Sequence, residues 1–92
     1  ILLLTYKDTK IFKSNYFSKF TFYKRKGILR LQSKNTGHWW KIAWVELPIQ
    51  NMYRLYHRYP NQTDYHVQCH RRHPQALLKY IKEHDQYMLN RK

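Results

Sequence analysis

The middle of the chain alternates between hydrophobic and polar positions in a way that predicts a β-hairpin. Residues 28–32 (ILRLQ) have the period of two that is typical of a strand. Residues 33–37 (SKNTG) are turn-forming and end in glycine, and residues 38–46 (HWWKIAWVE) then alternate again. Two β-rich runs joined by such a turn predict a hairpin over residues 28–46. Its second strand would place Trp40, Ile42 and Trp44 on one face and Trp39, Lys41, Ala43 and Val45 on the other.

The chain beyond Pro48 offers one or two further strands. Residues 49–59 (IQNMYRLYHRY) have apolar positions at helical spacing, but they also alternate, and their frequent tyrosines favour a strand. Residues 60–64 (PNQTD) predict a turn. Residues 65–69 (YHVQC) alternate as a short strand. In a regular strand, one face would carry Tyr65, Val67 and Cys69, and the other His66, Gln68 and His70.

The C-terminal segment predicts an amphipathic helix that begins at Pro74, a residue suited to the first helical turn. Leu77, Ile81, His84 and Met88 follow at spacings of four, three and four, which gives one apolar stripe over about four turns. We expect this helix to cover one face of a small antiparallel sheet. The predicted fold class is therefore α+β, with residues 28–92 forming a single small domain.

Residues 1–27 are harder to interpret because aromatic and basic side chains alternate there without a clear apolar face. Phe20 and Phe22 have strand-like spacing, which leaves a further strand open. We predict a basic-aromatic N-terminal arm, extended and able to order on a partner.

The charge of the chain points to a polyanionic partner. Eighteen Lys and Arg face five Asp and Glu, which gives a formal net charge of +13. The excess is not confined to a tail: residues 1–48 hold ten basic and two acidic residues (+8), and residues 49–92 hold eight and three (+5). RNA, DNA or an anionic membrane face could meet this charge. Because 17% of the residues are aromatic, stacking on bases favours a nucleic acid.

The segment YHVQCHRRHP (residues 65–74) raises the question of metal or catalytic chemistry. His66, Cys69 and His73 have spacings compatible with zinc, but structural zinc needs four ligands, and a regular strand points His66 and Cys69 to opposite faces. A Cys–His nucleophile needs an orienting group and a cleft, for which a short chain with five acids offers little. We predict no metal, no cofactor, no small-molecule substrate and no enzymatic activity. The single cysteine excludes an internal disulfide.

Basic side chains are the candidates for contacts to RNA. Arg71 and Arg72 precede the predicted helix, and paired arginines at a helix N-terminus favour phosphate, although a solvated charged face is the alternative. Residues 53–61 interleave arginine with tyrosine, which suits either base stacking or packing on a sheet. We assign the tryptophans and His84 to the core. The predicted RNA-binding residues are Lys24, Arg25, Lys26, Arg30, Lys34, Arg54, Arg58, His70, Arg71 and Arg72.

A short, basic, tyrosine-rich chain of this kind resembles a ribosomal protein. Its Lys/Asn/Tyr/Phe-rich composition and a first residue other than Met resemble an organellar, mitochondrial one. Residues 28–61 are faintly similar to the opening of the small-subunit ribosomal protein sixteen family. Residues 28–31 would match its first strand, residues 40–45 its second, and residues 59–60 its turn, although the family's glycine before that turn is absent here.

This resemblance implies a structural protein of the mitochondrial ribosome, which binds ribosomal RNA and contacts neighbouring ribosomal proteins. No run of 18 apolar residues occurs, so we predict no membrane contact. The alternative is a small basic accessory subunit of a mitochondrial membrane-bound respiratory complex, because such subunits share this composition.

Overall fold

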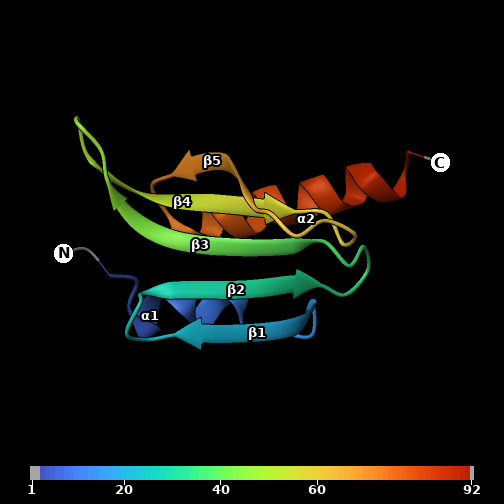
Figure 1. Cartoon of the computed structure of the whole chain (residues 1–92), viewed down its shortest axis with the longest axis horizontal. Helices are drawn as coiled ribbons and strands as arrows, with labels where there is room; N and C mark the ends of the chain where they lie inside the picture. Colours follow the sequence, from blue (N-terminus) through green and yellow to red (C-terminus); the bar gives the residue numbers. More distant parts are fainter. Residues whose placement is uncertain (1–2, 92) are drawn as a thin grey trace.

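A computed structural model describes residues 3–91 and has two layers, a five-stranded antiparallel sheet and a helical layer on one of its faces (Figure 1). Every strand pairs with its neighbours in the chain, in the order β1-β2-β3-β4-β5. This confirms the predicted α+β class with a C-terminal helix over an antiparallel sheet. The strands are β1 (Phe17–Tyr23), β2 (Ile28–Ser33), β3 (Trp39–Glu46), β4 (Asn51–Arg58) and β5 (His66–Arg71), and the helices are α1 (Tyr6–Thr9), the 3-10 helix η1 (Lys10–Phe12) and α2 (Pro74–Leu89).

The hairpin predicted over residues 28–46 is formed by β2 and β3. Leu29 pairs with Ile42 and Leu31 with Trp40, and all four side chains are buried. The indole Nε1 of Trp40 donates a hydrogen bond of 2.9 Å to the hydroxyl of Ser33, so this buried polar atom is satisfied. β4 adds to the hairpin through eight register pairs, which confirms the strand interpretation of residues 49–59.

Residues 3–27, the described part of the N-terminal segment, belong to the domain, in contrast to the arm predicted over residues 1–27. Phe20 pairs with Leu31 and Phe22 with Leu29, so β1 is an edge strand of the sheet. Leu4, Phe12 and Phe17 are buried in the core. A chain of this length has little apolar surface to bury, and burying these side chains stabilises the fold more than leaving them for a partner.

One glycine joins β1 to β2 where no other residue fits without strain. Gly27 has a φ of +64°, and a Cβ added there would lie 2.8 Å from the backbone nitrogen of Leu4 and 2.9 Å from the Cα of Leu3. Gly37, in the next turn, also has a positive φ of +78°, but its nearest neighbour would be the Cγ of Pro60 at 3.5 Å.

We expect Gly27→Ala to lower the free energy of unfolding by about 2–3 kcal/mol, because the left-handed backbone and the backbone clash both oppose it. Gly37→Ala is the matched control and should cost only about 1 kcal/mol, for the backbone conformation alone. Urea unfolding of both variants measures the difference. Equal losses would mean that the contact between Gly27 and residues 3–4 does not constrain the fold.

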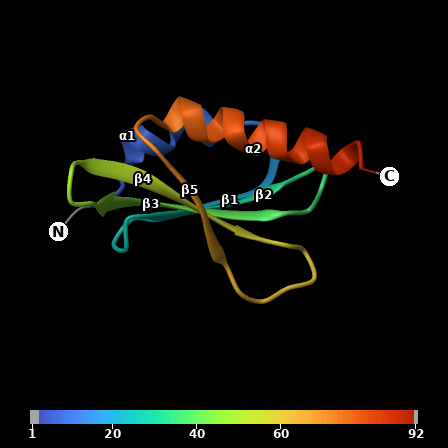
Figure 2. The same cartoon turned by 90° about the horizontal axis from the view of Figure 1, so that it is seen from above.

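The hydrophobic core lies between the sheet and the helical layer (Figure 2). Helix α2 contributes Leu77 and Ile81, both fully buried, and α1 and η1 lie on the same side of the sheet. The buried core residues are Leu4, Phe12, Phe17, Leu29, Leu31, Trp40, Ile42, Leu55, Leu77 and Ile81. The helical prediction from Pro74 onward is therefore confirmed, and the other face of the sheet carries no helix within residues 3–91.

A β-bulge changes which side chains of β5 share a face. Leu55 pairs with Cys69 and Tyr56 pairs with Val67, so the register shifts between them and Gln68 is the extra residue. Cys69 therefore faces the core while Val67 is 50% exposed on the other side. The predicted strict alternation of residues 65–70 is wrong here, since His66 and Cys69 lie on the same face rather than on opposite ones.

Candidate nucleic-acid interface

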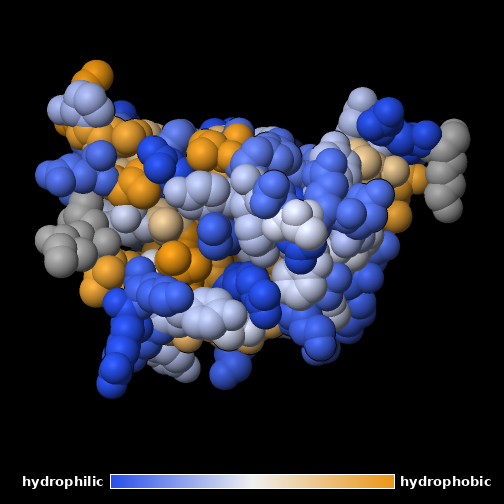
Figure 3. Space-filling view, viewed as in Figure 1, coloured by the Kyte–Doolittle hydropathy of each residue, from blue (hydrophilic) through white to orange (hydrophobic). Residues whose placement is uncertain are grey.

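The face of the sheet that points away from the helices, called here the open face, concentrates cations and aromatic rings. It is the face turned toward the viewer in Figure 1 and in the space-filling view of Figure 3, where hydrophilic colours cover much of it. Strand register places there Lys19, Thr21, Tyr23, Ile28, Arg30, Gln32, Trp39, Lys41, Ala43, Val45, Met52, Arg54, Tyr56, Arg58, Val67 and His70. None of these strand positions is acidic, and the adjoining loop carries one acid, Asp64.

The centre of the open face is a layer of cation–π contacts. Trp39 on β3 lies between two guanidinium groups, with the Cζ of Arg30 4.9 Å and that of Arg58 5.1 Å from the ring centroid. The Nζ of Lys41 lies 4.8 Å from the ring centroid of Tyr56 and 4.6 Å from that of Tyr65. Such contacts are worth roughly 0.5–1 kcal/mol at exposed sites, and they hold the cations along the sheet instead of letting them spread into solvent.

Hydrogen bonds hold two arginines of the open face, Arg54 and Arg58, in place. The Nε of Arg54 donates to the Nε2 of His70 at 2.9 Å, which joins β4 to β5 across the open face. Arg58 donates through one terminal nitrogen to the backbone carbonyl of Gln62 in the β4–β5 loop. Neither bond uses a carboxylate, so within the described residues the charge of both guanidinium groups is left without an acidic partner.

The predicted RNA-binding residues fall into several places. Arg30, Arg54, Arg58 and His70 come together on the open face. Lys24, Arg25 and Lys26 are exposed in the turn between β1 and β2, and Lys34 is exposed in the turn between β2 and β3.

Arg71 and Arg72 do not join the open-face group. Arg71 pairs with Tyr53 on the core-facing side of the sheet, where its guanidinium lies 5.4 Å from the ring centroid of Tyr80 and donates to the carbonyl of His70. Arg72 is exposed in the connection to α2. The strand-to-helix corner therefore has the expected place in the chain, but its two arginines are separate from the cations of the open face.

Sequence reasoning missed several members of the group on the open face. Trp39 was assigned to the core with the other tryptophans, but it is half-buried on the open face, and Trp40 is the fully buried one. Lys41 and Tyr65 were not selected as binding residues. The alternation of side chains along β3 was the available signal. Trp39 and Lys41 lie on the strand face whose other members are the small or aliphatic Ala43 and Val45.

Comparison of the chain with protein-family models, curated proteins and solved structures gave no match. Over residues 3–91, no helix is both long enough and apolar enough to cross a lipid bilayer.

Proposed function

We propose that the chain binds single-stranded regions of RNA on the open face of its sheet. The observation that supports this is the layer of cations held on aromatic rings, with no acidic residue at any outward strand position. Aromatic rings and guanidinium planes are the two side-chain surfaces on which unpaired bases stack, and the same cations neutralise phosphates. The strands of the sheet hold the aromatic rings and the cations at fixed spacing.

The shape of the sheet favours a single strand over a duplex. Five strands at about 4.8 Å spacing span roughly 19 Å, whereas the major groove of B-DNA is about 12 Å wide and admits a helix or a two-stranded ribbon. A face of this width cannot enter a groove as a unit. Unpaired nucleotides can instead lie across the strands with their bases against the sheet.

The ribosomal setting is the proposed context of this binding. It is supported by the basic, tyrosine-rich composition, which resembles that of mitochondrial ribosomal proteins, and by the absence of acidic residues on the open face. Ribosomal RNA would then occupy the open face, and neighbouring ribosomal proteins would contact other surfaces. Such a protein acts by holding RNA structure and needs no catalytic group.

The test is a binding titration against an RNA single strand of about 12 nucleotides, within the site sizes of roughly 4–16 found for single-strand binders. The five Lys and Arg at outward strand positions predict a slope of log K against log salt of about −3.5. Duplex DNA of equal charge should bind more weakly at the same salt concentration. A tighter complex with the duplex, or a slope near zero, would overturn the proposal.

A sedimentation experiment on an organelle lysate separates RNA from the respiratory alternative. Migration of the chain with a ribosomal subunit, lost after nuclease treatment, would support the RNA proposal. Migration with a detergent-dependent, nuclease-resistant complex would instead favour an accessory subunit of a respiratory complex, and the charge would then serve a protein or lipid partner.

A further inference from the structure

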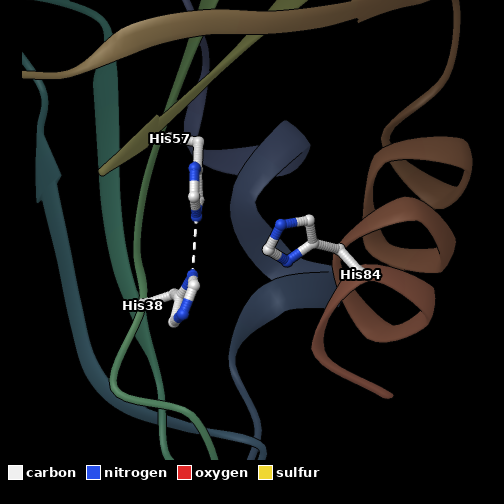
Figure 4. A group of neighbouring side chains, drawn as sticks. All are labelled: His38, His57 and His84. Atoms are coloured by element: carbon white, nitrogen blue, oxygen red, sulfur yellow. Dashed lines mark hydrogen bonds between the residues drawn. The ribbon is translucent and has the colours of Figure 1, made fainter. Parts of the chain in front are cut away.

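Three histidines that are distant in the chain meet in the interior, on the opposite side of the sheet from the open face. His38 precedes β3, His57 is near the end of β4, and His84 is on α2. Figure 4 shows the ring of His84 pointing from the helix into the space beside the other two rings. One ring nitrogen from each of the three lies within 4.8 Å of the others, and His38 and His57 are 5% and 1% exposed.

The hydrogen bonding of this group, called here the histidine cluster, is incomplete. The Nδ1 of His38 lies 2.7 Å from the Nε2 of His57, and the Nδ1 of His57 lies 3.4 Å from the Nε2 of His66. The Nδ1 of His84 is buried and has no hydrogen-bond partner among the described residues. A buried nitrogen without a partner costs about 1–3 kcal/mol, so three packed imidazoles are a poor way to fill this space unless something else binds there.

A carboxylate lies directly behind the cluster. Asp85 is fully buried, and its two oxygens accept hydrogen bonds from the hydroxyls of Tyr16 (2.5 Å) and Thr36 (2.9 Å). Its nearest basic group is the Nδ1 of His84, 3.9 Å from one oxygen, and no Lys or Arg in residues 3–91 pairs with it. A buried carboxylate needs positive charge nearby, and histidines that bind metals commonly have such a carboxylate as their outer partner.

We propose that the histidine cluster binds a divalent transition-metal ion, Zn²⁺, through His38, His57 and His84. Three imidazoles with a fourth position open are a known zinc ligand set. Tetrahedral zinc with Zn–N distances of about 2.0–2.1 Å requires ligand nitrogens about 3.3 Å apart. The pair at 2.7 Å would therefore separate slightly, and the third nitrogen would move inward. The proposal does not depend on RNA binding.

The protonation state of the His38 and His57 rings is compatible with Zn²⁺ binding. Burial, together with the imidazoles of His84, His38 and His66, lowers the pKa of His57 to about 3. Burial also lowers the pKa of His38. Neutral imidazole is the form that binds a metal, so no proton has to be displaced from these two rings at neutral pH. The side chain of His84 is 14% exposed, and Tyr59, which packs on His38 and His57, is 36% exposed, so the cluster lies close to the surface at these two residues.

The proposed site differs from the one considered along the sequence. His66, Cys69 and His73 raised the question of zinc, but His73 is the exposed residue at the N-cap position of α2 and Cys69 packs against the core. Of that motif, His66 alone touches the cluster, through His57. It would orient the ring of His57 rather than ligate the ion.

The experiment uses the full chain after treatment with a chelator. Zn²⁺ is titrated in competition with a coloured chelator, and Co²⁺ is added separately because tetrahedral Co²⁺ absorbs visible light. We expect one ion per chain, a visible Co²⁺ spectrum and a rise in melting temperature with Zn²⁺, as mass action requires for a ligand of the native state. His84→Gln should weaken Zn²⁺ binding by at least 100-fold, while His73→Gln should leave it unchanged.

Three outcomes would overturn the proposal: no stoichiometric Zn²⁺ or Co²⁺ binding by the wild-type chain, unchanged binding by His84→Gln, or loss of binding in His73→Gln. Circular dichroism in the presence of chelator checks that the variants are folded. If His84→Gln is unfolded, His38→Gln replaces it, since His38 lies outside both helix and strand.

Discussion

Replacing Arg30, Arg54 and Arg58 together by glutamine should lower the affinity for single-stranded RNA by about 100-fold at roughly 0.1 M salt. Each phosphate contact releases counterions worth about 0.7 of a decade in affinity under these conditions, and the three arginines are grouped on the open face. The slope of log K against log salt should fall by about two units. Fluorescence anisotropy with a labelled single strand measures both quantities.

The matched control removes the same charge from the helical layer. Lys10, Lys13 and Lys79 are exposed on or beside η1 and α2, on the other side of the sheet. Their joint replacement by glutamine should change the affinity by only a few fold, through net charge. Equal losses in the two triple variants would mean that binding follows overall charge, and the open face would then have no special role.

The largest loss of stability is expected from Asp85→Ala, which should lower the free energy of unfolding by about 2–4 kcal/mol. The substitution leaves the half-buried hydroxyls of Tyr16 and Thr36 without their acceptor, and hydrogen bonds to a charged group are worth about 1.5–3 kcal/mol. Urea unfolding with chelator present measures this without any contribution from metal. Glu83→Ala, an exposed acid on the same helix, is the control and should change the stability by less than about 0.5 kcal/mol.

We expect the free energies of unfolding of the wild type and Asp85→Asn to depend differently on pH in the acid range. Burial alone would raise the pKa of Asp85, but the neighbouring imidazole of His84, the hydroxyl of Ser33 and the hydrogen bonds from Tyr16 and Thr36 outweigh it, and the pKa is lowered. A lowered folded pKa means that the stabilisation is present above the ordinary carboxyl pKa and is lost as the pH falls through the folded value. The stability difference between the two proteins should therefore shrink below about pH 4. A difference independent of pH would show that Asp85 is not ionised in the fold.

The sequence predicted those elements whose pattern is local. The hairpin of β2 and β3 follows from alternation around a glycine turn, and α2 follows from the spacing of Leu77 and Ile81. The bulge at Gln68 was not predicted, because it depends on how β5 pairs with β4 and leaves no mark on the period. The N-terminal segment was misjudged because burial of Phe12 and Phe17 depends on surfaces supplied by the rest of the chain.

The residues of the candidate sites also fall into those that the local sequence indicates and those that depend on the tertiary fold. Arg30, Arg54 and Arg58 could be selected because basic residues among aromatic ones are visible in the sequence. Trp39 and Lys41 were missed because alternation separates the two faces of a strand without saying which of them is covered. The histidine cluster has no local signal, since His38 and His57 are nineteen positions apart and the third ligand comes from α2. A group of this kind becomes visible only after the sheet and α2 have been placed together.

The order of the strands has a consequence for how the chain folds as it is made. Because every strand pairs with the one before it, each hairpin closes a short loop and can form soon after its second strand has been synthesised. The link between Tyr16 and Asp85 instead spans 69 residues and joins the first strand region to the last helix. Until α2 is complete, the ring of Trp40 lacks the cover that His84 provides. The nascent domain is therefore a sheet whose apolar face is covered only in part, by α1 and η1, and it depends on α2 to complete the core.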